Sequence, residues 1–491
     1  MTERYGVEVI PNWHRSQVAD GGVRKIEMAV GVVEETYPAV YWPGDGFGDH
    51  LEFALKYDGT NLAILARLFR AVAEGEVLAY VRSTPTGKYA RRVWYLYELL
   101  TGRTLPLDDL TQGNYVDLLA RDAYYTITPC RQVRRQRIND NLPGDARFCP
   151  VVRRSDALRA FEAADITARC QRVMAAYPPA SLVRALNYLY TKETKSSFEI
   201  ERITPDSTRT ERFVALLHQA EHEDFCEKGR LIDLQNRVVD PRFRDADFRS
   251  FQNYVGENPG WQKERVHYAC PKPGDLPDLM AGLEAAHQRM RAGGVPVFVH
   301  AAAVAYGFVF LHPFGDGNGR IHRFLIHNIL ARRGFTPGGL IFPVSSAMLG
   351  NMAAYDASLE SFSRPLKKLV EYTLDEQGEM TVQNDTADWY RYMDLTPQAE
   401  ALARFIEQAV DEDLVNELAF LANYDRTKRG LQEVVDMPDR LLDLLLRLCI
   451  QNGGRLSAAK RAAHFSFLTE PEVAEIERVI RASREAGGAP P

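Results

Sequence analysis

Cysteine is scarce in this 491-residue sequence: six are scattered along it and no two are spaced as CxxC. The scatter excludes a disulfide scaffold, so we expect reduced thiols in a cytoplasmic protein. Membrane-length apolar runs are also missing, since the most apolar stretch, 297–311, is too short to span a bilayer. The first residues, MTERYGVEVIPNW, lack the apolar stretch of a signal peptide. We therefore expect neither secretion nor a membrane partner.

An excess of positive charge is missing as well. The net charge of -6 argues against nucleic acid or a membrane surface as the main partner. A single basic run, RQVRRQR at 131–137, is more typical of a surface patch than of a nucleic-acid site. A stretch near the C-terminus, 453–480, loosely resembles a helix–turn–helix and leaves a DNA-associated role open.

Helical periodicity prevails where the sequence is regular. Hydrophobic (45%) and charged (26%) residues occur in the proportions of a globular chain with several cores. After an irregular start, helices are predicted at 62–81, 90–100, 395–410 and 438–454. The turn DEQG at 375–378 predicts a boundary. We therefore predict a mainly α, multidomain protein divided into residues 1–155, 156–375 and 376–491.

The most informative stretch is HPFGDGNGRIHR at 312–323, directly after the apolar run. Pro313 disfavours the helical conformation at His312, so the buried helix 297–311 should end there. A second helix should begin near Arg320 and stop at Gly334. Three glycines between the helices allow a tight loop that approaches a ligand closely: Gly315, Gly317 and Gly319.

A loop followed by a helix N-terminus is an anion site, because free N–H groups and the helix dipole favour phosphate oxygens. Arg320 and Arg323 oppose that dipole, which makes a bound polyanion the natural reason for them. His312, with an ordinary pKa near ~6.5, suits proton abstraction from a hydroxyl. Asp316 is a hard ligand for Mg²⁺. Asn318 can donate hydrogen bonds to charge developing at phosphorus. Together these residues predict transfer of a phosphoryl-type group from a nucleotide.

The run matches the signature HPFx[D/E]GNGRxxR, so the chain resembles the Fic (Fido) family over fewer than half of its residues. The resemblance implies a helical core that transfers AMP from ATP·Mg²⁺ to a Ser, Thr or Tyr hydroxyl of a protein, including the chain itself. It implies that His312 is the general base and Asp316 the metal ligand. Phe314 would anchor the loop. The implied phosphate-binding residues are Gly317, Asn318, Gly319, Arg320 and Arg323.

Two further segments extend the resemblance. Asn351 and Tyr355, four apart in a predicted helix at 345–362, resemble the pair that lines the adenine side of Fic pockets. The alternative, a core tyrosine beside a surface asparagine, stays open. Upstream, residues 260–273 alternate weakly and predict a short β-hairpin. In Fic proteins a flap at this place docks the target backbone by strand addition.

A third segment, about 180–203, is a predicted helix that ends near Ser197 and Glu201. It resembles the inhibitory motif [S/T]xxxE[G/N], which implies that Glu201 pairs with Arg323 and blocks the terminal phosphate. Arg202 departs from the motif, because Gly or Asn there tolerates the left-handed conformation that ends a helix. Either the helix continues toward Ile203 or its end differs. The alternative is a solvated face of mixed charge.

Another motif points elsewhere. His218 and His222 fit the HxxEH pattern of a zinc peptidase, but no third ligand stands at a definable spacing, so a solvated helix face is favoured.

The sequence thus predicts an autoinhibited protein adenylyltransferase, without a nucleic-acid partner. A homo-oligomer is left open. Two alternatives remain: an enzyme that removes AMP or uses another nucleotide donor, with Glu201 orienting water, and a regulatory or DNA-associated module with a dormant nucleotide site.

Overall fold

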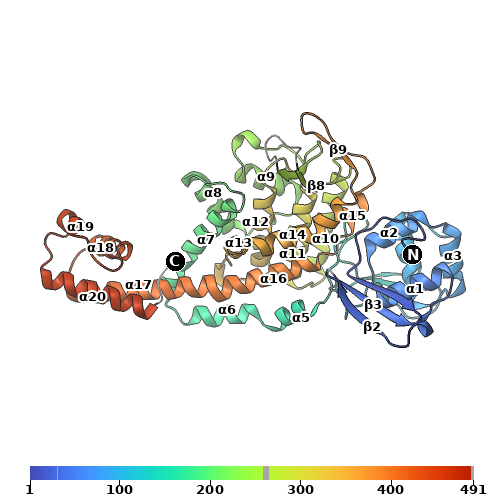
Figure 1. The fold of residues 1–491 in the computed structure, drawn as a ribbon, viewed down its shortest axis with the longest axis horizontal. Coiled ribbons are helices and arrows are strands. Elements are labelled where there is room, and N and C mark those ends of the chain that lie inside the picture. The colour runs from blue at the N-terminus through green and yellow to red at the C-terminus, as the bar shows by residue number, and fades with distance from the viewer. Residues whose placement is uncertain (30, 258–264, 488–491) are drawn as a thin grey trace.

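The computed structural model describes residues 1–29, 31–257 and 265–487. The molecule is mainly α, as predicted, and its sheets have only two or three strands. Figure 1 shows an elongated arrangement in which a module containing the N-terminus lies at one end of a helical centre. A small C-terminal module lies at the other end, carried on a long helix. No helix of the described residues is long and apolar enough to cross a membrane.

The N-terminal module begins with a small sheet where the sequence predicted irregular chain. Its order is β1-β3-β2, with β1 parallel and β2 antiparallel to β3. Only half of the residues in these strands are polar, but the strands are short and their stability depends on pairing with one another, so the local pattern did not identify them. The strands are β1 (His14–Ala19), β2 (Lys25–Ala29) and β3 (Val32–Pro38). The module's helices are α1 (Phe47–Tyr57), α2 (Leu62–Ala71), α3 (Glu74–Ser83) and α4 (Lys88–Thr101).

A second small sheet of this module contains the basic run 131–137. Its strands are β4 (Val116–Asp117), β5 (Arg131–Val133) and β6 (Ile138–Asp140). Arg135 contacts Glu98 at 3.2 Å and Asp109 at 2.8 Å. Arg137 donates to the carbonyls of residues 110, 111 and 113. These two guanidinium groups are therefore occupied within the fold.

The central part contains α5 (Asp156–Ala163), α6 (Ile166–Ala175), α7 (Pro179–Glu199), α8 (Ser207–Gln219), α9 (Lys228–Val238), β7 (Tyr254–Glu257), β8 (Arg265–Ala269), α10 (Leu276–Ala292), α11 (Val297–Leu311), α12 (Asn318–Arg332), α13 (Val344–Gly350) and α14 (Met352–Lys367). Helix α11 is apolar on all sides and spans the predicted residues, because neighbouring helices, α10, α12 and α16 (Thr396–Gln408) among them, cover it. It ends beside the N-terminus of α12 and so fixes both sides of the 312–323 loop.

One predicted helix is divided in the structure. The single helix predicted at 345–362 is broken, because Asn351 leaves the helical region (φ -140°, ψ 62°) and its side chain accepts a hydrogen bond from Ala354 N at 3.2 Å as the cap of α14. The turn at 375–378 joins the hairpin β9 (Tyr372–Leu374) and β10 (Met380–Val382). Residues as far as Leu418 nevertheless pack into the central hydrophobic core.

The C-terminal part of the chain begins with α15 (Ala387–Arg391) and α16 (Thr396–Gln408). A π-helical turn, Ala409–Leu414, joins α16 to α17 (Val415–Val434). A separate hydrophobic cluster, from Leu431 to Ile480, then unites the end of α17 with α18 (Asp439–Gln451), α19 (Ala458–His464) and α20 (Glu470–Gly487). Glu470 and Glu472 in the first turn of α20 would repel a DNA backbone.

Candidate functional site

The candidate site lies where α11 ends and α12 begins. Helix α11 ends at His312, as the following proline predicts, and His312 itself adopts the left-handed conformation (φ 51°, ψ 58°). Gly317 (φ 90°) caps α12, which therefore starts at Asn318, two residues before the predicted start. A Cβ at Gly317 would lie 2.8 Å from Val239, so this turn requires glycine both for its conformation and for its space.

One nitrogen of the His312 ring is already occupied. Its Nδ1 lies 3.1 Å from the carbonyl oxygen of Val309, one turn earlier in α11. Because a carbonyl only accepts, Nδ1 carries the proton and Nε2 keeps a lone pair. Burial lowers the pKa of His312 to about 4, so the imidazole is neutral at pH 7. A neutral imidazole with a free Nε2 is the form that a general base requires.

Side chains from α12 and from the segment after α9 close the loop. The amide of Asn318 bonds both backbone groups of Phe314, at 3.1 and 2.8 Å, so it braces the loop and faces inward. Phe314 is fully buried, as expected of an anchor. Asp245 accepts from Gly315 N at 3.0 Å, and the buried Gln235 bonds Asp245 at 3.3 Å. Nothing in the sequence pattern marked Gln235 or Asp245.

Asp316 is the acidic group of the loop, and 43% of its side chain is exposed. Its Oδ1 lies 2.8 Å from Arg320 and accepts from Gly317 N at 2.6 Å. Among the described residues these contacts engage only Oδ1. An exposed carboxylate with its second oxygen open fits an oxygen-ligated divalent cation such as Mg²⁺.

Both arginines, Arg320 and Arg323, contact a single carboxylate from the turn that follows α7. Arg320 Nε lies 2.7 Å from Glu201 Oε2, and Arg323 Nη2 lies 2.8 Å from Glu201 Oε1. Both arginine side chains are at least 98% buried, so their charges need a partner. A Cβ at Gly319 would lie 2.4 Å from Glu201 Oε1, which places this carboxylate at the N-terminus of α12. An anion from the chain itself therefore occupies the predicted anion site.

The end of α7 brings a second residue to Arg323. Ser197 accepts from Arg323 through its hydroxyl at 2.9 Å and its carbonyl at 2.6 Å. Arg202 adopts the left-handed conformation (φ 58°), and Ile203 N bonds back to the carbonyl of Phe198 at 3.1 Å. The sequence left the ending of this helix open at Arg202. The structure shows that the helix ends there in a left-handed turn, with arginine at the position where Gly or Asn is usual.

Helix α7 is anchored to α12 one turn earlier as well. Glu193 is fully buried, and its Oε1 lies 2.7 Å from His327 Nε2. Its other oxygen accepts from Ser345 N at 2.8 Å, which adds α13 to the same contact. The carboxylates at 193 and 201 thus face α12, which the alternative of a solvated face did not predict.

The hairpin beside the loop pairs β7 with β8 in antiparallel order. Residues 260–264 of the predicted flap lie outside the described residues. Its second strand alternates as predicted, with Val266 and Tyr268 buried. Tyr355 is buried beside Arg323, whereas Asn351 is exposed and caps α14. The structure thus places Tyr355 in the interior next to Arg323, and Asn351 at the surface.

The HxxEH pattern at 218–222 does not form a histidine pair on one helix. Helix α8 ends at Gln219, and the His218 ring stacks on Tyr190 with centroids 4.0 Å apart. His222 lies beyond the helix, so the two rings do not stand one turn apart.

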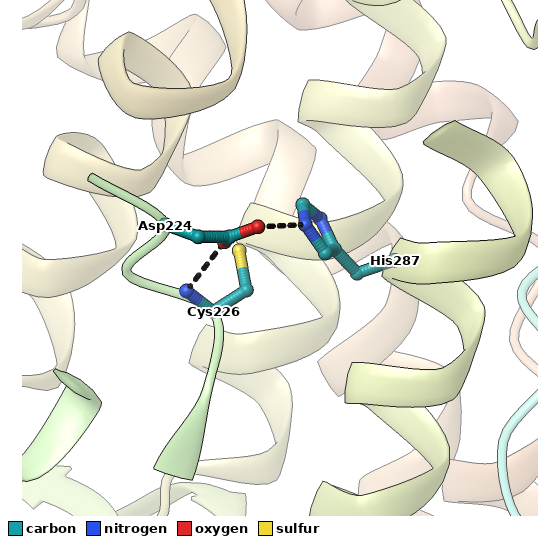
Figure 2. A group of neighbouring side chains, drawn as sticks. All are labelled: Asp224, Cys226 and His287. Atoms are coloured by element: carbon teal, nitrogen blue, oxygen red, sulfur yellow. Dashed lines mark hydrogen bonds and ion pairs between the residues drawn. The ribbon is translucent and has the colours of Figure 1, made fainter. Parts of the chain in front are cut away.

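A second polar cluster lies away from the loop, where Asp224, Cys226 and His287 meet (Figure 2). His287 Nε2 lies 3.2 Å from Asp224, which also accepts from the backbone N–H of Cys226 at 3.2 Å. The potential ligand atoms of the three residues lie within 4.8 Å of one another, a spacing compatible with a metal ion.

Hydrogen bonds behind His287 fix its tautomer. Arg333, which can only donate, lies 3.1 Å from His300 Nδ1, and His300 Nε2 lies 3.0 Å from His287 Nδ1. The proton order therefore runs from Arg333 to His300 to His287, which carries its own proton on Nε2 and donates it to Asp224. A protonated Nε2 has no lone pair for a metal, so this cluster fits a structural role.

Two guanidinium groups complete the environment of Asp224. Arg332 lies 2.6 Å and Arg291 3.3 Å from its Oδ2. Burial alone would raise the pKa of Asp224, but hydrogen bonds from His287, Cys226 N and Arg332 hold it well below its usual range. The carboxylate thus ties α10 and α12 to the chain that precedes α9.

A model of the Fic/DOC family matches residues 224–330, which include the whole loop. The chain contains a Fic domain. It is 34% identical over 117 residues to "Protein adenylyltransferase Fic" of Aedes aegypti, and 34% identical over 110 residues to the protein of that name from Drosophila grimshawi. These matches cover 23% and 22% of this chain and 21% and 20% of the two relatives. The chain thus spans about a fifth of the length of these curated relatives.

Two solved structures are also similar. One is a Fic family protein from Desulfovibrio desulfuricans G20, 19% identical, with a TM-score of 0.38 over 65% of this chain and 86% of that one. The other is a Fic domain containing signaling protein from Bacteroides thetaiotaomicron, 17% identical, with a TM-score of 0.37 over 52% and 95% of the two chains. Helix α7 with Ser197, and Glu201 in the turn after it, precede the residues that match the Fic family.

Proposed function

We propose that this chain transfers AMP from ATP to a Ser, Thr or Tyr hydroxyl of a protein, and that Glu201 restrains the reaction. The observation that carries the proposal is the site around one loop: a neutral imidazole with a free Nε2 stands beside a helix N-terminus with two buried arginines. The names of the relatives, protein adenylyltransferase Fic, support the same reaction.

In the proposed step, the acceptor hydroxyl oxygen forms a bond to the α-phosphorus of ATP. The bond from that phosphorus to the oxygen bridging to the β-phosphate breaks, and pyrophosphate leaves. His312 Nε2 takes the hydroxyl proton. Arg320 and Arg323 hold the distal phosphates at the N-terminus of α12. Asp316 would hold Mg²⁺, which neutralises phosphate charge when bound.

Glu201 would restrain the reaction because its carboxylate and the terminal phosphate of ATP compete for the same position. Its carboxylate satisfies both arginines and lies against Gly319, where the terminal phosphate of ATP would bind. ATP bound beside Glu201 would lack these contacts, and its α-phosphate would be misaligned for attack. Removal of the carboxylate should therefore raise the transfer rate more than it changes the affinity for ATP.

The test compares wild type with Glu201→Gly, incubated with ATP and Mg²⁺, by the intact mass of the protein. Self-labelling should rise at least about tenfold, equivalent to ~1.4 kcal/mol off the barrier. EDTA should abolish it. Glu199→Gly is the matched control, because Glu199 is exposed at the end of the same helix. Loss of activity in Glu201→Gly would instead favour a Glu201 that orients water for the removal of AMP.

A further inference from the structure

Arg249 lies in the segment between α9 and the hairpin, and its side chain is almost fully buried at 5% exposure. Its Nε donates to the carbonyl of His312 at 2.8 Å, and its backbone N–H donates to the carbonyl of Pro313 at 2.8 Å. The same residue therefore binds two consecutive carbonyls of the loop, directly at the candidate base.

The remaining guanidinium nitrogens bind both ends of the hairpin. Nη1 donates to the carbonyl of Phe251, before β7, and Nη2 donates to the carbonyl of Pro271, after β8, each at 2.7 Å. The planar fork of arginine presents donors in three directions at once, which the single ammonium of lysine does not. One side chain thus joins the end of α11, the entry of the hairpin and its exit.

The partners of this guanidinium explain why an arginine tolerates burial here without a carboxylate. Within the described residues its side-chain hydrogen bonds all go to carbonyl oxygens, and one of these belongs to His312, the C-terminal cap of α11. The C-terminus of a helix carries partial negative charge, which a cation complements. The free-energy penalty for burying the Arg249 guanidinium is therefore smaller than that for an isolated buried charge.

We propose that Arg249 is a positioning residue: it fixes the main chain of His312 relative to the hairpin, and so aims the imidazole at the place where an acceptor segment would lie. The reaction it serves is the proposed AMP transfer. Arg249 touches no reacting atom in this assignment, and it acts through the carbonyls of His312 and Pro313. Without its side chain, the link from the carbonyl of His312 to both ends of the hairpin would be lost, while the backbone bond to Pro313 and the bond from Tyr268 to the carbonyl of Phe310 would remain.

A direct test reads the His312 ring by NMR on full-length protein with labelled histidine. The signal is assigned by its absence in His312→Ala. Wild type should show a single tautomer with the proton on Nδ1. In Arg249→Met the two ring nitrogens should shift toward a tautomer mixture, and Arg249→Lys should restore the wild-type pattern only in part. An unchanged His312 signal in both variants would overturn the proposal.

Arg91→Met is the matched control. Arg91 is a 7% exposed arginine that donates to the carbonyls of residues 114 and 137 in the N-terminal module, far from the loop. Its loss should leave the His312 signal unchanged. If Arg249→Met does not fold, the Arg249→Lys spectrum decides, because that variant keeps the charge and loses only the fork.

Transfer is measured separately in the Glu201→Gly background. Adding Arg249→Met should lower the self-labelling rate about 10- to 100-fold while the affinity for ATP stays within about twofold. A folded double variant that labels at the parental rate would contradict positioning. If Glu201→Gly itself transfers nothing while Arg249→Met still shifts the His312 signal, the proposed function fails and the positioning role stands.

Discussion

At the scale of single residues, the candidate chemistry depends on one nitrogen atom of His312. The carbonyl of Val309 holds the proton on Nδ1, and burial lowers the pKa of the ring to about 4. Sequence reasoning selected this histidine from its place between a helix and a glycine loop. Its tautomer and its lowered pKa come from the surrounding packing, because both depend on which atoms lie around the ring.

His312→Ala should lower self-labelling by about two to four orders of magnitude, because the variant lacks the ring nitrogen that accepts the hydroxyl proton. The comparison is made in the Glu201→Gly background, with the rate followed by intact mass and ATP binding by calorimetry. Binding should be retained, since the two arginines and the helix N-terminus are unchanged. A variant that transfers AMP as fast as its parent would remove His312 from the mechanism.

At the scale of elements, the end of α7 decides how the anion site is occupied. The helix brings Ser197 to Arg323, the turn after it brings Glu201 to both arginines, and Glu193 fixes the helix to α12 and α13. The sequence located this helix but left its ending at Arg202 open. The pairing of Glu201 with Arg320 was not predicted, because the motif implies only one partner and the position of α7 against α12 is a tertiary property.

Arg202→Gly should raise the free energy of unfolding by about 1 kcal/mol, because glycine adopts the left-handed conformation at 202 without the steric cost that arginine bears. Urea denaturation followed by circular dichroism measures the change. Lys195→Gly, at an exposed position inside α7, should instead lower it by about 1 kcal/mol. Equal destabilisation by both substitutions would refute the assigned helix ending.

At the scale of the whole molecule, one long helical path connects the Fic domain to the C-terminal module (Figure 1). Helix α17 packs against α7 and α20, and the π-helical turn at its start places Asp413 2.5 Å from Lys192 of α7. Further along, Asp425 accepts from Ser181 of α7 at 3.2 Å. Helix α7, which ends just before Glu201, thus contacts both α12 and α17.

Asp224 should make the stability of the Fic domain depend on acid pH. Its pKa is lower in the folded protein than in the unfolded chain, so its contribution is complete above the ordinary value of about 3.9 and is lost as pH falls below it. Asp224→Asn should lower the free energy of unfolding at pH 7 by about 3 kcal/mol and lose less stability than wild type between pH 5 and pH 3.

Urea unfolding curves at pH 7, 5 and 3 measure this difference. Asp439→Asn serves as the control, because that carboxylate is 72% exposed and its contacts with Lys428 and Gln432 are long, at 3.4 and 3.3 Å. It should follow the wild-type curve. A parallel pH dependence in wild type and Asp224→Asn would show that Asp224 is not the group that titrates.

The sequence by itself determined the local chemistry of this protein. The order of residues from His312 to Arg323 predicted the end of α11, the glycine loop and the anion site, because helix termini and tight turns depend on neighbouring residues. The Fic resemblance rested on the same stretch. The break at Asn351 and the sheet at 14–38 were missed, since capping competes with periodicity and strand pairing depends on partners elsewhere in the chain.

Only the tertiary structure decided what surrounds the loop. Glu201 lies more than a hundred residues before its arginines, and Arg249 binds carbonyls contributed by three separate segments. The cluster at Asp224 joins residues whose spacing resembles no motif, and its hydrogen-bond order distinguishes a structural network from a metal site. Such contacts depend on how helices pack, which local sequence patterns do not encode.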